Sequence, residues 1–347
     1  MNNNGIYDQL KMMDIPYDLR TRIMQLIDDY LESVEVTGES VEFEYCPKCG
    51  IVHPRTVKSG KTRKGKQMYR CKHCGKRFVE DHGKLTFYSH KDASFWAKVI
   101  DDTVHKASSY ETSREMQASR NTILSMRHKV LVFLEEARKN TEIQENMQMD
   151  EKYLLGSHKG VHVPGIHSRT NGEKSSKRGL NKEQACIICC VGKDGDTYAE
   201  TLNAGLMGKE DLRKFSHHVA RGSNITTDGN ATYDLLCRIR QANRFVCTNC
   251  KDHRADVNLN AVNSFHSMIG EMNRKYRGVA TKYLNRYNTL FSCIWKHFTH
   301  RRETEDSMKV FGSITKNVNI VVTRKELMDY NLLVLPDLEW TREPIAS

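Results

Sequence analysis

The chain has 347 residues, and its 54 lysines and arginines outnumber its 43 aspartates and glutamates, which gives a formal net charge of +11. Hydrophobic residues are 38% of the sequence, enough for packed cores, so a largely disordered chain is excluded. No apolar run reaches the roughly 18 residues of a membrane-spanning helix, and the polar residues 1–5 do not begin a signal peptide. We therefore expect a cytoplasmic protein with a polyanionic partner.

The first 40 residues carry no recognisable chemistry. In residues 7–13 and 17–34, apolar side chains recur at helical spacing. We expect two helices here that pack together or dimerise, and we treat residues 1–40 as a helical N-terminal segment.

Residues 41–85 contain two Cys-x-x-Cys pairs, Cys46 with Cys49 and Cys71 with Cys74. Each pair can present two thiolates to one tetrahedral zinc ion, and the stretch between the pairs is long enough to return as a hairpin. A glycine directly follows the second cysteine of each pair, where a tight turn needs a permissive backbone. The spacing therefore predicts a zinc ribbon, with two unrelated pairs of buried cysteines as the alternative.

Residues 55–77, inside this ribbon, carry ten basic residues and no acidic one. A charged run alone is often a solvated loop, but this run forms the arms and tip of the predicted hairpin. A cationic hairpin suits the phosphate backbone of DNA and does not read its bases. The residues that we expect to contact DNA here are Lys61, Arg63, Lys64 and Lys66.

Residues 90–140 show the pattern of three helices. An apolar face over residues 92–106 predicts the first, residues 112–115 form a capping-box pattern that starts the second, and Ser119 caps the third. This arrangement is typical of a helix-turn-helix domain, although an ordinary helical bundle has the same pattern. The side chains expected in the DNA groove are Arg120, Asn121, Thr122 and Ser125. The polar residues 135–145 look like a linker.

Residues 146–302 alternate between strands and helices. The patterns predict strands at 147–155, 185–191, 197–202, 224–227 and 244–248, and helices at 209–220, 231–241 and 259–275. Three strands before the first helix indicate an antiparallel meander joined to parallel strands, the order of a ribonuclease-H-like fold. We assign no role to the tail, residues 303–347, in which residues 318–322 have a strand pattern.

The expected fold class is therefore α+β and multidomain. It comprises N-terminal helices, a zinc ribbon, a helix-turn-helix and a ribonuclease-H-like α/β catalytic domain.

Three residues of this catalytic region suit the binding of divalent metal ions. Phosphoryl transfer is helped by two metal ions about 4 Å apart, which a few oxygen ligands hold. Asp150 lies in the first predicted strand, Asp228 closes the fourth, and Asn263 lies on the last helix. Each alone would be an ordinary turn or cap residue, but their positions match the topology.

Residues 45 to about 300 resemble the zinc-ribbon DDE transposases of bacterial insertion sequences, the ISXO-like group. The resemblance rests on the cysteine framework and on the stretches 149–153, 177–184, 227–229 and 260–287. It implies a DNA transposase that binds the terminal repeats of its element, cleaves the end phosphodiesters and joins the 3′ ends to target DNA. It also implies that Asp150, Asp228 and Asn263 hold magnesium or manganese.

The same resemblance implies double-stranded DNA as the partner, a homo-oligomer on DNA, no membrane, and a location at the bacterial nucleoid. Two positions depart from the usual pattern: Asn263 stands where many DDE enzymes have glutamate, and Gly270 stands where resembling sequences tend to have lysine. Arg274 and Lys275, about one turn further along the helix, are candidates to replace that lysine. His266 shares a helix face with Asn263 and either assists the site or is structural.

A second metal site is a weaker prediction. Cys247, Cys250 and His253 have the spacing of metal ligands, but a fourth ligand is not evident, and Cys237 is only a guess. The basic residues 158–182 are most simply a loop between the first two strands of the catalytic region, next to Asp150, where they could also fold onto DNA.

Two other functions fit parts of the pattern. A catalytically impaired or repurposed DNA-binding protein would keep the zinc ribbon and the helix-turn-helix, and the neutral Asn263 and Gly270 favour it. A ribonuclease or a resolvase-type nuclease would need neither DNA-binding module. The transposase remains the leading hypothesis because Asp150, Asp228 and the cysteine framework are all in place.

Overall fold

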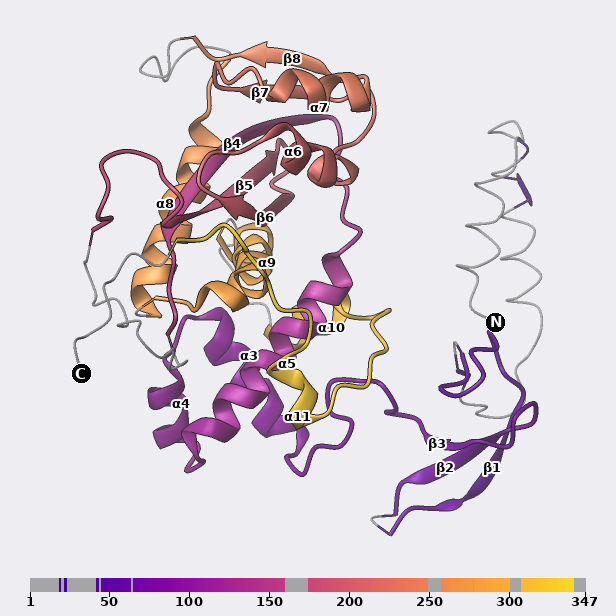
Figure 1. Ribbon diagram of the computed structural model, residues 1–347. Helices are drawn as coiled ribbons and strands as arrows, with labels where there is room; N and C mark the ends of the chain where they lie inside the picture. The colour runs from indigo at the N-terminus through magenta and orange to yellow at the C-terminus, as the bar shows by residue number, and fades with distance from the viewer. Residues whose placement is uncertain are drawn as a thin grey trace. The chain divides into compact units, whose positions relative to one another are not determined.

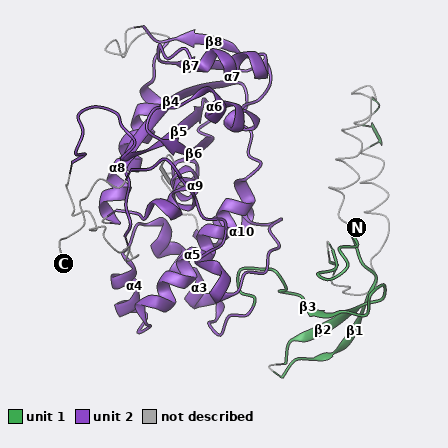
Figure 2. Cartoon of the chain, viewed as in Figure 1, with its two compact units in different colours: residues 1–87 green, residues 88–347 purple. Residues whose placement is uncertain are grey.

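The structure is a computed structural model of the chain, and it falls into two compact units, residues 1–87 and residues 88–347 (Figure 2). Each unit is described by itself. The residues that the structure describes are 19, 22–23, 42–43, 45–63, 65–159, 174–248, 257–276, 278–299 and 307–339. The helices predicted at 7–13 and 17–34 therefore lie almost wholly outside the described residues, as do Lys64, Cys250 and His253.

The first unit contains a three-stranded antiparallel sheet with its second strand in the middle (Figure 1). The strands are β1 (Thr56–Lys61), β2 (Gln67–Cys71) and β3 (Arg77–Val79). The predicted hairpin is confirmed, and β3 completes the sheet. The alternation of β2 turns Tyr69 inward and leaves Arg70 exposed. Tyr69 is paired with Phe78 of β3, and both rings pack against Phe43.

Four cysteines of this unit lie together. One sulfur from each of Cys46, Cys49, Cys71 and Cys74 lies within 4.8 Å of the others. Each pair closes a tight turn in which the N–H of the following glycine donates to the carbonyl of the first cysteine at 3.0 Å. Both glycines, Gly50 and Gly75, have positive φ, as this turn requires.

This cluster has the geometry of a structural zinc site. Tetrahedral zinc holds thiolates at about 2.3 Å, which places the sulfurs a little under 4 Å apart, and the sulfurs of Cys46 and Cys74 are 3.5 Å apart. Burial works to raise the pKa of the Cys46 thiol, but hydrogen bonds from the backbone of Cys49 and Lys48 outweigh it and bring that pKa to about 7. The hydrophobic core of the unit is small, so a metal cross-link suits it.

The second unit is built on a five-stranded mixed sheet in the order β6-β5-β4-β7-β8. The strands are β4 (Asn146–Leu155), β5 (Gln184–Gly192), β6 (Thr197–Ala204), β7 (Asn224–Thr227) and β8 (Asn243–Val246). β4, β5 and β6 pair antiparallel, whereas β7 runs parallel to both β4 and β8. The five predicted strands are confirmed. The α+β unit with its mixed sheet is consistent with a ribonuclease-H-like domain.

Helices cover both faces of this sheet (Figure 1). α6 (Lys209–Phe215) and α7 (Tyr233–Arg240) form the main hydrophobic core with Met147, Met149 and Ile188. α8 (Asn260–Lys275) contacts β4 and β5, and α9 (Leu284–Ile294) contacts β6. β5 is buried along almost its whole length, which explains the unbroken apolar run in the sequence.

Short turns of helix extend some of these elements. α6 is continued by a 3-10 helix, Ser216–His218. α9 is preceded by another 3-10 helix, Thr281–Tyr283, and followed by a π-helical turn, Trp295–Thr299. The helix predicted at 209–220 therefore ends as an α-helix at Phe215. Within the described residues, no helix combines the length and apolar character that crossing a bilayer requires.

Three helices precede the sheet in the same unit: α3 (Ala93–Val104), α4 (Ser109–Glu115) and α5 (Arg120–Arg138). Ser119 caps α5 by accepting from the N–H of Thr122, as predicted. The predicted capping box at residues 112–115 is wrong. The box is formed by Ser108 and Glu111, and Thr112 is a buried residue inside α4, because the helix begins one turn earlier than the predicted capping box indicated.

Two further sequence predictions are corrected by the structure. The polar linker does not begin at residue 135, because α5 continues through Arg138, and Ile143 is fully buried beside Val219. Residues 318–322 form no strand. The described part of the tail instead contains two short helices, α10 (Ser307–Ile314) and α11 (Arg324–Leu327), which pack on α3 and α5.

A buried arginine joins α5, α9 and the tail. Arg286 is 1% exposed, and its Nη1 donates to Nδ1 of His128 at 3.1 Å. Its Nη2 donates to the carbonyls of Leu327, at 3.0 Å, and Tyr330. Burial, and then the charge of Arg286, lowers the pKa of His128 to about 3, so this histidine is neutral and can accept the hydrogen bond. Arg286 therefore ties α5 and the tail to α9, which in turn packs on β6.

The start of α8 is fastened to the central strand by Gln148 of β4. Its side-chain oxygen accepts from the backbone N–H groups of Ala261, at 2.9 Å, and Val262, at 3.2 Å. Its amide nitrogen donates to Asn258 at 3.3 Å. A strand residue thus satisfies the unpaired donors at this helix end and fixes the helix against β4.

Gln148→Ala should lower the free energy of unfolding by about 1 kcal/mol, because the first turn of α8 loses its acceptor. The measurement is chemical denaturation of the purified chain. Gln144→Ala is the control, since Gln144 is exposed and, among the described residues, its side chain bonds only to Glu142. Equal stability of the two variants would contradict this role of Gln148.

Elemental analysis should find about one zinc ion per chain, and Cys71→Ser should remove it, because four thiolates are needed to close the site. Chelation should unfold the first unit, seen as loss of its protection from proteolysis. Cys293→Ala, which alters a buried cysteine of α9, is the control and should retain the zinc. A full zinc content in Cys71→Ser would contradict the site.

Candidate active site

The pairing of β4 with β7 brings two predicted site residues together. The strands run parallel, with Gln148 opposite Thr226. Continued by two residues, this register places Asp150 beside Asp228, which directly follows β7. Two carboxylates that are distant in the sequence therefore meet where the short strand β7 ends.

A third carboxylate, Glu151, joins them. One oxygen from each of Asp150, Glu151 and Asp228 lies within 4.8 Å of the others. Asn230 contributes to this arrangement, because its Nδ2 lies 3.4 Å from Glu151 and its backbone N–H donates to Asp228 at 3.0 Å. The sequence analysis missed Glu151, for which the only signal was its position directly after Asp150.

The cluster is partly buried, and this changes the acidity of its members. Burial, together with the charge of Asp228, raises the pKa of Asp150 to about 6. Burial raises the pKa of Glu151 to about 7, and the charges of Asp150 and Asp228 act in the same direction. In the absence of a cation, negative charge at this position is therefore unfavourable.

His266 faces the cluster from α8. Its Nδ1 lies 3.8 Å from Oδ2 of Asp150, and its side chain is 9% exposed. Burial, and then the charge of Lys152, lowers the pKa of His266 to about 4, so the ring is neutral at pH 7. Its Nε2 is buried and has no hydrogen-bond partner in the part of the chain that the structure describes.

Asn263 lies one turn before His266 on α8, with its side chain exposed. Among the described residues, that side chain makes no hydrogen bond, and only its backbone is bonded, to Leu259 and Ser267. Glu271, an alternative acid further along α8, is half exposed and lies 3.9 Å from Lys106 and 3.8 Å from Lys275. It is not part of the carboxylate cluster.

The donor set at Asp150, Glu151 and Asp228 fits a divalent cation. Magnesium and manganese prefer carboxylate oxygens and take few of them from the protein. The raised pKa values of Asp150 and Glu151 mean that their charged forms are unfavourable here, and a bound cation would offset that negative charge. The register of β4 and β7 brings Asp150 and Asp228 together, and an oxygen of Glu151 lies within 4.8 Å of both.

The other predicted site residues lie apart from this cluster in the chain. Arg120 and Asn121 are exposed at the first turn of α5, and Thr122 is half-buried with its hydroxyl 2.9 Å from that of Ser119. In the first unit, Lys61 and Arg63 are at the hairpin tip, and Lys66 is paired with Asp81. These residues stay candidates for contact with DNA.

The second metal site also stays a prediction. Cys237 and Cys247 are buried, and the remaining two candidate ligands lie outside the described residues. Gly270 is half-buried on α8, and an added Cβ there would meet no atom within 4 Å. The backbone therefore leaves room for a side chain at this position.

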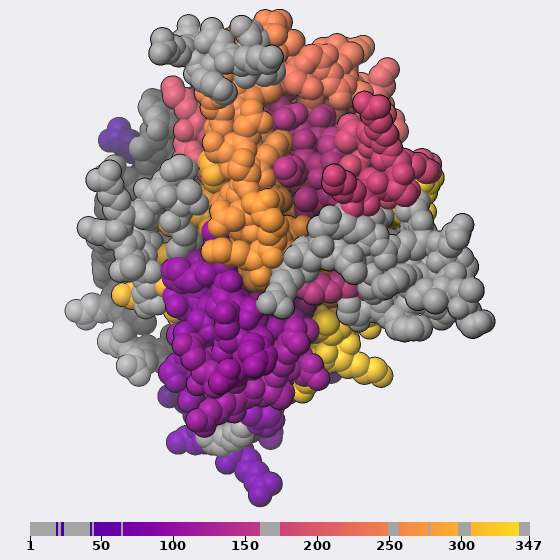
Figure 3. All heavy atoms as spheres, turned by 90° about the vertical axis from the view of Figure 1, so that its left-hand side faces the viewer, coloured from indigo at the N-terminus to yellow at the C-terminus, as the bar shows by residue number. Residues whose placement is uncertain are grey.

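α8 is displayed on one face of the second unit, where its surface meets that of α3 and α4 (Figure 3). The contact includes a hydrogen bond from the hydroxyl of Tyr276 to the carbonyl of Thr103 at 3.0 Å. The guanidinium of Arg127 lies over the ring of Tyr276. Tyr276, at the end of the helix that carries His266 and Asn263, therefore contacts the helical part of the unit.

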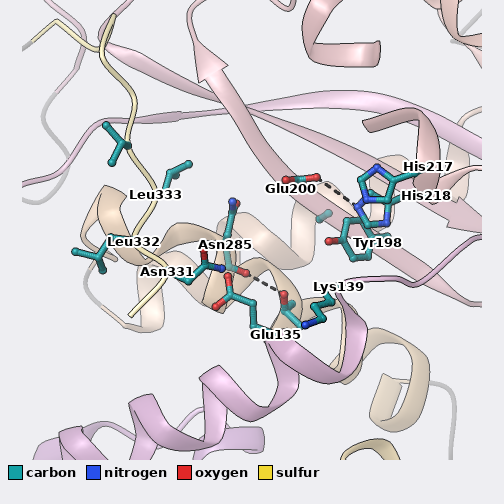
Figure 4. A pocket seen from close by; sticks show the side chains of 13 residues that line it. Glu135, Lys139, Tyr198, Glu200, His217, His218, Asn285, Asn331, Leu332 and Leu333 are labelled. Carbon is teal, nitrogen blue, oxygen red and sulfur yellow. Dashed lines mark hydrogen bonds and ion pairs between the residues drawn. The ribbon is translucent and has the colours of Figure 1, made fainter. Parts of the chain in front are cut away.

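A polar cavity of about 330 Å³ lies elsewhere in the second unit, between α5, β6, α9 and residues 331–334 (Figure 4). In it, Nε2 of His218 is 3.6 Å from Glu200, and the ring of His218 stacks on Tyr198. Burial raises the pKa of Glu135, another lining residue, to about 7. None of the predicted site residues lines this cavity.

Comparisons with solved structures give low overall similarity. The cryo-EM structure of a simian T-cell lymphotropic virus intasome in complex with PP2A regulatory subunit B56 gamma is 11% identical, with a TM-score of 0.26, over 66% of this chain and 73% of that chain. The crystal structure of a pre-cleavage Mos1 transpososome is 8% identical, with a TM-score of 0.23, over 89% and 90%. Scores this low carry no argument about fold or function. No curated protein matches the chain.

The match to a family model is specific. Residues 142–292 match the model of the ISXO2-like transposase domain. The matched region begins just before β4, ends within α9, and contains Asp150, Glu151, Asp228 and Asn263. This part of the chain is therefore an ISXO2-like transposase domain of the DDE type.

Proposed function

We propose that the chain is a metal-dependent DNA transposase that binds the terminal repeats of an insertion sequence, cleaves the end phosphodiesters and joins the 3′ ends to target DNA. The observation that carries the proposal is the carboxylate cluster of Asp150, Glu151 and Asp228 inside a transposase domain. The proposal needs both observations together, because an acidic cluster alone and a transposase domain alone both occur in proteins without activity.

Asp150 and Asp228 would hold magnesium or manganese, and Glu151 supplies further negative charge beside them. The bound ions would supply Lewis-acid stabilisation of the attacking and leaving oxygens. The chain positions its carboxylates through the register of β4 and β7, and the neutral ring of His266 borders Asp150 without adding a positive charge. Asn263, exposed on the same helix, would contribute an amide oxygen once DNA and metal are bound.

DNA binding would come from two modules. The zinc ribbon, with Lys61, Arg63, Lys64 and Lys66, would contact phosphates. The helices α3 to α5 would serve as the helix-turn-helix, with Arg120 and Asn121, which are exposed at the start of α5, toward the DNA. Joining two element ends requires two active sites, so we expect a homo-oligomer on DNA.

One set of observations favours a second candidate, a catalytically impaired or repurposed DNA-binding protein. Asn263 is neutral and its side chain has no hydrogen bond among the described residues, and Gly270 offers no cation. Such a protein would bind the terminal repeats and leave them intact. The cleavage assay below separates the two functions.

Asp150→Asn and Asp228→Asn should each lower metal-dependent cleavage of terminal-repeat DNA more than about 100-fold, because each removes a charged ligand. Binding to the same DNA should stay near normal, while Asn263→Ala should be milder. The measurement is nicking of labelled DNA with magnesium or manganese, beside a mobility-shift assay. Asp194→Asn, on an exposed turn, is the matched control. Binding without nicking by the parent would favour the impaired protein.

Glu151→Gln should stabilise the metal-free protein at pH 8 by about 1–2 kcal/mol more than at pH 5. The folded pKa of Glu151, about 7, exceeds its unfolded value, so its carboxylate destabilises the fold above pH 7 and this penalty is lost as the pH falls. Denaturation at both pH values with chelator measures it.

Glu210→Gln, which alters an exposed carboxylate of α6, is the control and should show no such difference. The prediction fails if Glu151→Gln has the same effect on stability at pH 5 and pH 8.

A further inference from the structure

The side chain of Arg244, on the neighbouring strand β8, donates hydrogen bonds to the turn that carries Asp228. Nε of Arg244 donates to Oγ1 of Thr227 at 2.9 Å. Its Nη2 donates to the backbone carbonyls of Asp228 and Asn230, each at 2.8 Å. One guanidinium therefore bonds the residue before Asp228, Asp228 itself and the residue that bridges to Glu151.

The same side chain is fixed on its other side. Nη1 of Arg244 donates to Asp234 of α7 at 2.6 Å, and the guanidinium lies over the ring of Tyr233. Tyr233 is fully buried, and its hydroxyl lies beside the carboxylate of Glu151. Arg244 is 12% exposed, so its bonds to the turn are partly shielded from water, whereas its partner Asp234 is 58% exposed.

Asp228 needs such support because it lies outside regular structure. β7 ends at Thr227, and Gly229 follows Asp228. Local bonds alone are few: Thr227 donates its hydroxyl to the carbonyl of Asp228, and the N–H of Asn230 donates to its carboxylate. A backbone with a glycine at this point has many alternative conformations, and most of them would move the carboxylate away from Asp150.

We propose that Arg244 is a positioning residue for the divalent-metal site, which fixes the Asp228 turn so that its carboxylate stays beside those of Asp150 and Glu151. The inference rests on the proposed function, because the site it serves is the proposed catalytic one. Arg244 does not touch the metal or the DNA in this role. It acts through the backbone of Asp228.

The geometry requires arginine rather than a positive charge. A planar guanidinium can donate from Nε and both terminal nitrogens in fixed directions, whereas an ammonium group is a single point with rotatable donors. Lysine at this position would keep the pair with Asp234 or the bonds to the turn, but not both. The variant Arg244→Lys therefore keeps the charge and loses the fixed turn.

The test measures manganese binding by the full-length, zinc-loaded protein without DNA, by electron paramagnetic resonance of free manganese. The double variant Asp150→Asn/Asp228→Asn defines the signal that does not come from the site. Arg244→Lys should weaken site-specific manganese binding about 10-fold to 100-fold, the range found for residues that orient metal ligands. The manganese concentration for half-maximal DNA cleavage should rise by a similar factor.

Arg240→Lys is the matched control, because Arg240 is a mostly buried arginine of neighbouring α7 that pairs with Glu142. It should lower thermal stability without changing the manganese affinity. Unchanged affinity in a folded Arg244→Lys protein would overturn the inference. If the parent itself binds no more manganese than the double variant, the proposed function fails instead.

A second substitution covers the case in which Arg244→Lys does not fold. Thr227→Val keeps the shape of a fully buried side chain and removes the hydroxyl that accepts from Arg244 and donates to Asp228. It should weaken manganese binding in the same direction and by a smaller factor than Arg244→Lys. Parent-like affinity in folded Thr227→Val would also count against the positioning role.

Discussion

The parallel pairing of β4 with β7 is the constraint on which the rest of the second unit depends. Met147 lies opposite Ile225 in this pairing, and both side chains point into the main core. A slip of β7 by one residue would turn Ile225 toward the other face of the sheet, so burial fixes the register. The same register determines that Asp150 and Asp228 lie side by side. Core packing and the acidic cluster are therefore two consequences of one strand pairing.

The acidic cluster is unfavourable for the metal-free fold, because burial and like charges raise the pKa values of Asp150 and Glu151. Three sets of contacts fix the elements around this cluster. The main core fixes β4, Gln148 fastens α8 to the same strand, and Arg244 bonds the turn after β7. Such over-determination is expected where a site stores unfavourable charge that a ligand relieves.

Local pattern was enough to predict the strands, because β5 is one apolar run and a glycine with positive φ turns the chain into β6. Asp150 and Asp228 could be predicted as neighbours because the predicted strand order placed one in the first strand and the other at the end of the fourth. Glu151 could not be predicted, since strand alternation places neighbouring residues on opposite faces. The turn at Asp228 brings oxygens from both faces within reach of one point. The strand expected at 318–322 failed because pairing needs a partner edge, and these residues pack on α5 instead.

The burial of α5 limits how this helix can serve DNA binding. Only its first two residues, Arg120 and Asn121, are exposed, and most of its second half is buried, with His128 bonded to Arg286. A recognition helix that reads bases exposes a face over several turns, whereas a helix N-terminus with a cation suits phosphate. Contacts of this kind position a protein on DNA without selecting a sequence. Selection of the element ends therefore has to come from residues beyond the start of α5.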